Sequence, residues 1–103
     1  MRHRTHRHVL GVKKEHRSAL VSGLAAQLLT HARIRTTLPR ARALRPFVEK
    51  VITLAKKGAS ADAAGRLHYY RLALARVRDE GAVALLFKDR VSAFANRKGG
   101  YTR

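Results

Sequence analysis

Apolar residues in the N-terminal part of the chain recur at helical spacing in two separate rows. Leu20, Leu24 and Leu28 lie four residues apart and His31 continues the row, which predicts a helix over about residues 14–31. Val21 and Ala25 flank this row. The second row consists of Leu44, Val48, Val51, Ile52 and Ala55. It predicts a helix that begins at Thr37-Leu38-Pro39, continues to about Lys57 and stops at Gly58, because threonine caps helices, proline suits the first turn and glycine ends them.

Two further rows predict two helices in the C-terminal part. Ser60 is a suitable cap for the first of them, with Asp62 in its first turn, and Asp79-Glu80 opens the second, which runs to about Ala95. The apolar rows are Leu67, Tyr70, Leu74 and Val77 for the first helix, and Val83, Leu86, Phe87, Val91 and Phe94 for the second.

Residues 32–37 alternate instead of recurring at helical spacing. Arg33 and Arg35 would lie on one side and Ile34 and Thr36 on the other, which predicts a short strand with one basic face. After the break at Gly99-Gly100, residues 101–103 resemble the start of another strand. The predicted fold class is therefore α/β (α+β), in the order helix, strand, three helices, strand, within a single globular domain over residues 14–103.

Positive charge dominates the composition. The chain has 23 lysines and arginines against 6 acidic residues, a net charge of +17, and arginine outnumbers lysine 16 to 7. Self-repulsion of this size is offset by a polyanionic partner. Because a guanidinium binds phosphate bidentately and stacks on bases, the arginine excess indicates nucleic acid, and structured RNA in particular.

The first segment, residues 1–13, has too few large apolar side chains to order itself. We expect it to be an extended basic arm that becomes ordered on RNA. Its histidines could be metal ligands, but no cysteine or well-placed carboxylate completes a tetrahedral site, so RNA contact is the favoured interpretation.

The richest group of basic residues surrounds the predicted strand and the helix that follows it. Arg33 and Arg35 share a strand face, Thr36 and Thr37 offer hydroxyls, and Arg40 and Arg42 lie in the first turn of the helix. Cations are unfavourable at a helix N-terminus unless an anion lies there. This group therefore predicts a phosphate site more strongly than charge alone, although a solvated basic face would look similar.

The C-terminal segment suggests a second contact. Gly99 and Gly100 would let the backbone turn and approach phosphate closely, and Arg97 and Arg103 flank Tyr101. Tyr69 and Tyr101 lie off the apolar rows, so each could stack on a base or pack at the edge of the core. Glu49 lies one turn after Arg45, which predicts an ion pair within the helix.

These observations define one set of candidate RNA-binding residues. The set is Arg2, His3, Arg4, Arg7, Lys13, Lys14, His16, Arg17, Arg33, Arg35, Thr36, Thr37, Arg40, Arg42, Arg45, Arg97, Gly99, Gly100, Tyr101 and Arg103.

Other classes of function are disfavoured. The serines form no catalytic constellation with a histidine and an acid, and there is no phosphate-cradling glycine motif, so we expect no enzyme, cofactor, metal site or small-molecule substrate. No apolar run reaches the roughly 18 residues of a membrane span, and no secretory signal is evident at the start. A DNA-binding helix-turn-helix formed by the last two helices is the alternative, but Asp79-Glu80 would then place two negative charges against phosphates.

Several motifs resemble the bacterial large-ribosomal-subunit protein seventeen family. They are Met1-Arg2-His3, His16-Arg17, Ile34-Arg35-Thr36-Thr37, Leu44-Arg45, Ile52-Thr53-Leu54-Ala55-Lys56 and Arg97-Lys98-Gly99-Gly100-Tyr101-Thr102-Arg103. They keep the family's order and spacing over nearly the whole chain, and the last is the most specific. His8 and Val12 stand where the family often has arginine, so the arm is less basic than the family pattern.

The resemblance implies a two-layer α/β domain whose C-terminal sheet is truncated here, because the family usually continues with two more strands. It also implies a structural constituent of the large (50S) ribosomal subunit in the cytoplasm. Such a protein would bind and stabilise large-subunit rRNA near the exit of the nascent-peptide tunnel, beside neighbouring large-subunit ribosomal proteins. A free homo-oligomer is not expected.

Overall fold

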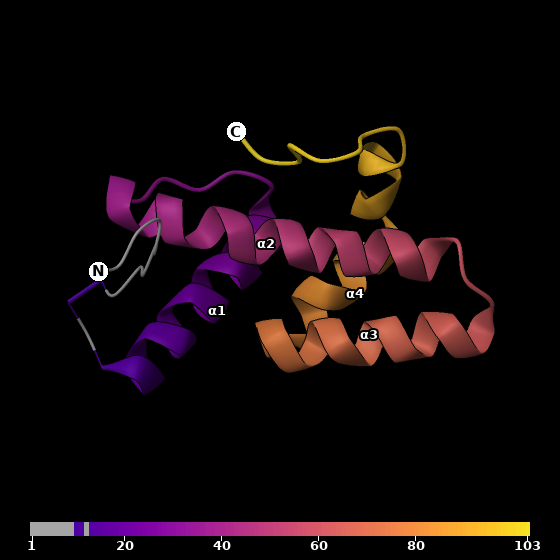
Figure 1. The fold of residues 1–103 in the computed structure, drawn as a ribbon, viewed down its shortest axis with the longest axis horizontal. Coiled ribbons are helices and arrows are strands. Elements are labelled where there is room, and N and C mark those ends of the chain that lie inside the picture. Colours follow the sequence, from indigo (N-terminus) through magenta and orange to yellow (C-terminus); the bar gives the residue numbers. More distant parts are fainter. Residues whose placement is uncertain (1–9, 12) are drawn as a thin grey trace, which may run out of the picture.

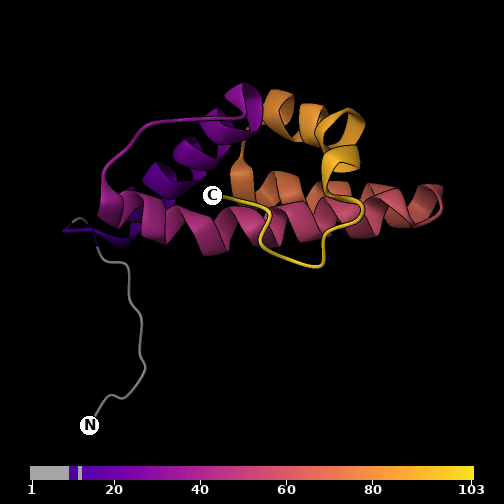
Figure 2. The same cartoon turned by 90° about the horizontal axis from the view of Figure 1, so that it is seen from above.

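Four α-helices and one short 3-10 helix form the fold in the computed structural model, which describes residues 10–11 and 13–103 (Figure 1). The elements are α1 (Lys14–His31), α2 (Leu38–Ala59), α3 (Ala63–Val77), α4 (Glu80–Lys88) and η1 (Arg90–Phe94). The longest helix, α2, contacts all the others, and α3 runs alongside it in both views (Figure 2). α1 and α4 pack against each other beside this pair.

The predicted α/β fold is wrong for the described part of the chain, which contains no strand. Residues 33–37 form neither a helix nor a strand, and they keep the predicted alternation, with Arg33 and Arg35 exposed and Ile34 and Thr36 half-buried. Alternation is a local property, whereas a sheet needs a second backbone to pair with. The C-terminal residues do not supply one, because Tyr101 and Thr102 hydrogen-bond to a side chain of α2 instead. The two-layer α/β domain with a truncated C-terminal sheet, which the family resemblance implied, is wrong for the same reason: the described residues contain no strand.

The bounds predicted for α1 are confirmed, but its buried face is not the leucine row. The buried residues are Ser22, Ala25, Ala26 and Leu29. Leu24 and Leu28 are half-buried and His31 is exposed. Three of these four side chains are small, which lets the backbone of α1 approach its neighbours, and the predicted leucine row lies beside this face.

The apolar row of α2 is confirmed, since all five of its members are buried. Thr37 stands at the N-cap with extended backbone and Pro39 lies in the first turn, as predicted. The predicted end is wrong, because α2 continues through Gly58 to Ala59. Gly58 is buried inside the helix, where an added Cβ would lie 2.9 Å from Cε2 of Phe87. This glycine therefore allows close packing against α4 instead of stopping the helix.

The caps of α3 and α4 are aspartates. Asp62 accepts a hydrogen bond from Gly65 N at 2.8 Å and Asp79 accepts one from Ala82 N at 3.0 Å, which satisfies helix N-terminal donors. Ser60, the predicted cap of α3, instead follows α2 and donates to the carbonyl of Lys57 at 3.2 Å. The prediction of one helix from Asp79 to Ala95 is also wrong, because α4 ends at Lys88 and η1 follows.

The inner face of α3 is turned relative to its predicted row. Ala73 and Val77 are buried, Tyr70 and Leu74 are half-buried, and Leu67 is 48% exposed. Tyr69 lies off the apolar row in the sequence, yet in the structure it packs against the core. A Cβ added at Gly58 would lie 3.5 Å from the Cβ of Tyr69. The close approach of α2 at Gly58 thus brings Tyr69 into the core.

We predict opposite effects for two glycine-to-alanine substitutions in helices. Gly58→Ala should destabilise the protein, because the cost of overpacking, ~1–3 kcal/mol, exceeds the gain in helix propensity. Gly23→Ala should stabilise it by ~0.5–1 kcal/mol, because nothing lies within 4 Å of the added Cβ. Urea unfolding of the purified chain measures both, and equal stabilisation by the two substitutions would show that the α2–α4 contact is loose.

Candidate nucleic-acid interface

The segment that joins α1 to α2 presents arginines to solvent. Arg33 and Arg35 are exposed, and with Ile34, Thr36 and Ala41 they line a shallow cavity of about 520 Å³. The half-buried Ile34, which packs against the core, fixes one side of this segment and turns the two arginines outward. Thr37, whose backbone is extended, leads from here directly into α2.

The first turn of α2 continues this basic surface. The Thr37 hydroxyl makes no capping hydrogen bond, and the turn contains no acidic residue. Arg40 in this turn and Arg42 just beyond it are exposed. Amide donors without a side-chain acceptor and cations at the positive end of a helix both favour a bound anion. Of the group that the sequence indicated, Arg33, Arg35 and Thr36 line the same cavity, and the two arginines of α2 do not line it.

A second group lies at the start of α1. Lys13 is the N-cap residue, Lys14 and His16 are exposed in the first turn, and Arg17 is half-buried one turn further on. Glu15 is the single acid in that turn. The other predicted arm residues, Arg2, His3, Arg4 and Arg7, lie outside the described residues.

The C-terminal residues 97–103, the C-terminal tail, pass over α2 (Figure 2). Gly99 has φ +154° and Gly100 has φ +59°, which confirms that the turn uses glycine conformations. Arg97, Gly99, Gly100 and Arg103 are exposed, and a Cβ on either glycine would meet nothing within 4 Å. The tail is therefore open to an external ligand on the side of its glycine turn.

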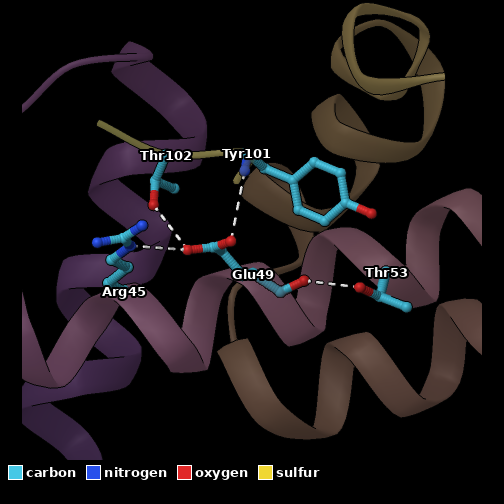
Figure 3. Close-up of polar contacts among 5 residues, drawn as sticks. All are labelled: Arg45, Glu49, Thr53, Tyr101 and Thr102. Atoms are coloured by element: carbon cyan, nitrogen blue, oxygen red, sulfur yellow. Dashed lines mark hydrogen bonds and ion pairs between the residues drawn. The ribbon is translucent and has the colours of Figure 1, made fainter. Parts of the chain in front are cut away.

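Glu49 holds the tail against α2 (Figure 3). Its carboxylate accepts hydrogen bonds from Tyr101 N at 3.3 Å and from the Thr102 hydroxyl at 3.0 Å. It also accepts one from Arg45 Nε at 3.1 Å, so the predicted ion pair within the helix is confirmed. The role in fixing the tail was missed, because nothing in the sequence connects positions 49 and 102.

Lys56 and Phe94 fix the side chain of Tyr101. Lys56 Nζ hydrogen-bonds to the tyrosine hydroxyl at 3.1 Å, lies 5.0 Å from the ring centroid and donates to the carbonyl of Arg97. Phe94 meets the ring edge to face at 5.5 Å. Two roles were predicted for Tyr101, base stacking and packing at the edge of the core. The contacts with Lys56 and Phe94 are of the second kind.

Burial by itself raises the pKa of the Glu49 carboxyl. The hydrogen bonds from Thr102, Arg45 and Tyr101 N, together with the positive charge of Arg45, outweigh burial and hold that pKa below its ordinary value. The carboxylate form is therefore the one that fixes the tail.

Two arginines bind backbone carbonyls within the protein. Arg66 donates to the carbonyl of Phe87 at 3.3 Å, near the end of α4, and Arg90 donates to the carbonyl of Thr30 at 2.8 Å, near the end of α1. Both cations lie where helix carbonyls lack partners and where the helix dipole favours positive charge. Each of these two side chains thus has a structural contact in the fold.

Within residues 10–11 and 13–103, no group of three or more histidine, cysteine, aspartate or glutamate side chains could hold a metal ion. No described helix is long and apolar enough to cross a membrane.

The described residues define a small helical domain with basic groups on its surface, and comparison with known proteins gives the family. Residues 20–103 match the model of the family described as Ribosomal protein L17. The chain belongs to this family, and the resemblance inferred from its motifs is confirmed. The family is that of a ribosomal protein and not of an enzyme, in agreement with the interpretation of the sequence.

Three curated relatives align with the whole chain, and each is named Large ribosomal subunit protein bL17. The relative from Opitutus terrae is 60% identical and the chain spans 61% of its length. The relative from Methylacidiphilum infernorum is 48% identical, with 73% of its length spanned, and the one from Novosphingobium aromaticivorans is 47% identical, with 68% spanned. The chain thus spans between about three fifths and three quarters of these relatives.

We predict that Glu49→Gln destabilises the protein by roughly 1.5–3 kcal/mol at neutral pH, because the substitution removes the negative charge and replaces one acceptor oxygen by an NH2 group that faces donors. Arg45→Gln is the control and should cost only ~0.2–1 kcal/mol, since its side chain is 66% exposed. Thermal unfolding measures both.

The same pair of variants gives a pH dependence. A carboxyl whose pKa is lowered by folding stabilises the protein above its unfolded pKa, and the benefit disappears as pH falls through the folded value. The advantage of the native chain over Glu49→Gln should therefore vanish in acid. An advantage that persists at the lowest pH would contradict the role of the Glu49 charge.

Proposed function

We propose that this chain is a structural constituent of the large ribosomal subunit in the cytoplasm and that it binds and stabilises large-subunit rRNA. The observation that supports this most is family membership, together with relatives named large-subunit proteins that align with its full length. The family pattern in the sequence further suggests a place near the exit of the nascent-peptide tunnel, beside other ribosomal proteins.

The mechanism that we propose is neutralisation of closely spaced phosphates. Arg33, Arg35, Arg40 and Arg42 are all exposed, and they lie on either side of the N-terminus of α2 in the sequence. Contacts of this kind go to the RNA backbone and shape, because the deep groove of A-form RNA hides base edges. By neutralising phosphates, these arginines would let RNA segments that otherwise repel each other come close together.

Two further contacts are part of the proposal. The first is the arm, residues 1–13, followed by the basic start of α1, with residues 14–103 as the globular domain. The second is the glycine turn of the tail, with Arg97 and Arg103 beside it. The proposed RNA-binding residues are the complete set derived from the sequence, with Arg45 and Tyr101 also engaged by Glu49 and Lys56 respectively.

Co-sedimentation tests the proposal directly. The tagged full chain, expressed in a bacterial host, should sediment with 50S particles and remain bound after a moderate salt wash. In competition binding, large-subunit rRNA fragments should displace labelled rRNA more effectively than duplex DNA of equal length. Absence from the particle, or preference for duplex DNA, would refute the proposal and favour the DNA-binding alternative.

We predict that the affinity for rRNA falls steeply with salt concentration and that Arg33 and Arg35 account for part of this dependence. The plot of log affinity against log salt should be steep, and Arg33→Gln with Arg35→Gln should reduce its slope by ~0.7–0.9 for each phosphate that is no longer neutralised. Arg71→Gln, at an exposed position on α3, should change the slope less. If Arg71→Gln reduces the slope as much, per arginine replaced, as the substitutions at Arg33 and Arg35 do, net charge alone governs binding.

A further inference from the structure

A second cavity, of about 490 Å³, lies where the N-terminal half of α1, the middle of α2 and the C-terminal end of α3 meet. Its size is within the roughly 300–1,000 Å³ that is typical of ligand pockets. The apolar part of its lining includes Pro46 and Phe47, and the Phe47 side chain is half-buried. The proposed RNA surface at residues 33–42 does not line it, so it is a separate place on the molecule.

Four cations line this cavity from all three helices. They are Arg17 from α1, Lys50 from α2, and Arg76 and Arg78 from the end of α3, while no acidic residue contributes to the lining. Only Arg17 among them was predicted as a contact, because the four positions are distant in sequence. Like charges gathered around an apolar surface are unfavourable without an anion between them.

Resting on the proposed function, we infer that this cavity binds one unpaired nucleotide of rRNA, with its base against Phe47 and its phosphates among the four cations. An aromatic surface beside arginines is the usual means of holding an unstacked base. The cavity offers few groups that could read the base. Its buried Ser22 hydroxyl already donates to the carbonyl of Arg76 at 2.8 Å, so we expect little preference among bases.

An acidic peptide is the other polyanion that four cations could attract. Two observations favour the nucleotide. Three of the four cations are arginines, which bind phosphate bidentately and also stack on a base. The cavity that these cations line also contains the aromatic ring of Phe47. A nucleotide has a phosphate for the cations and a flat base for the ring, whereas an acidic peptide has no such base.

The test compares single-stranded and duplex RNA binding by the full chain and two variants. Phe47→Leu removes the ring while keeping an apolar side chain, and it should weaken binding of oligoadenylate about fivefold or more, as expected for loss of stacking. Binding of a duplex RNA of the same length should change less than twofold. Arg76→Gln should weaken oligoadenylate binding more than Arg71→Gln, its matched control on the same helix.

A crosslinking measurement keeps the test independent of folding. Oligonucleotide carrying 5-iodouridine, irradiated with the unmodified chain, should crosslink to Phe47 or its neighbours in the cavity. Crosslinks confined to residues 33–42, or equal loss of duplex and single-strand binding in Phe47→Leu, would overturn the inference. Competition by polyglutamate, with no competition by oligoadenylate, would also overturn it in favour of an acidic protein.

Failure of this inference is distinguishable from failure of the proposed function. If Phe47→Leu and Arg76→Gln bind every RNA as the native chain does, and the native chain still sediments with 50S particles, only the nucleotide site is refuted. If the native chain does not join the particle, the proposed function itself fails.

Discussion

The apolar row of α2 is the surface on which the other helices depend. Val48, Val51 and Ile52 are essentially removed from solvent, and α1, α3, α4 and η1 all contact the helix that carries them. Each such side chain contributes about 1.5–3 kcal/mol when fully buried. In a chain of 103 residues with a net charge of +17, this single row provides much of the attraction that opposes electrostatic repulsion.

The scarcity of acidic residues gives each of them unusual weight. Of the six in the chain, Asp62 and Asp79 cap helices and Glu49 joins the C-terminal tail to α2. These three carboxylates accept hydrogen bonds from backbone donors and from neighbouring side chains. With only six acidic residues against 23 lysines and arginines, the chain remains strongly basic.

The sequence predicted the elements of the fold better than their arrangement. The bounds of α1 and the buried row of α2 follow from periodicity and capping, which are local. The strands were wrong because pairing partners are not local, and the inner face of α1 is shifted from the predicted row because Ser22, Ala26 and Leu29 are buried together with Ala25. The basic group at residues 33–42 is contiguous and could be found, whereas the four cations around Phe47 come from three helices and could not.

The hydrogen bond from Arg90 to the carbonyl of Thr30 joins residues 60 positions apart, and α1 packs against α4, which lies just before that arginine. A growing polypeptide therefore makes its first helix long before the partner that covers it exists. Contacts between residues this far apart in the sequence lower the folding rate, because a long loop must be closed before they can form. Until then the growing chain exposes an unfinished apolar face together with a dense positive charge, so binding to the proposed polyanionic partner and completion of the fold compete in time.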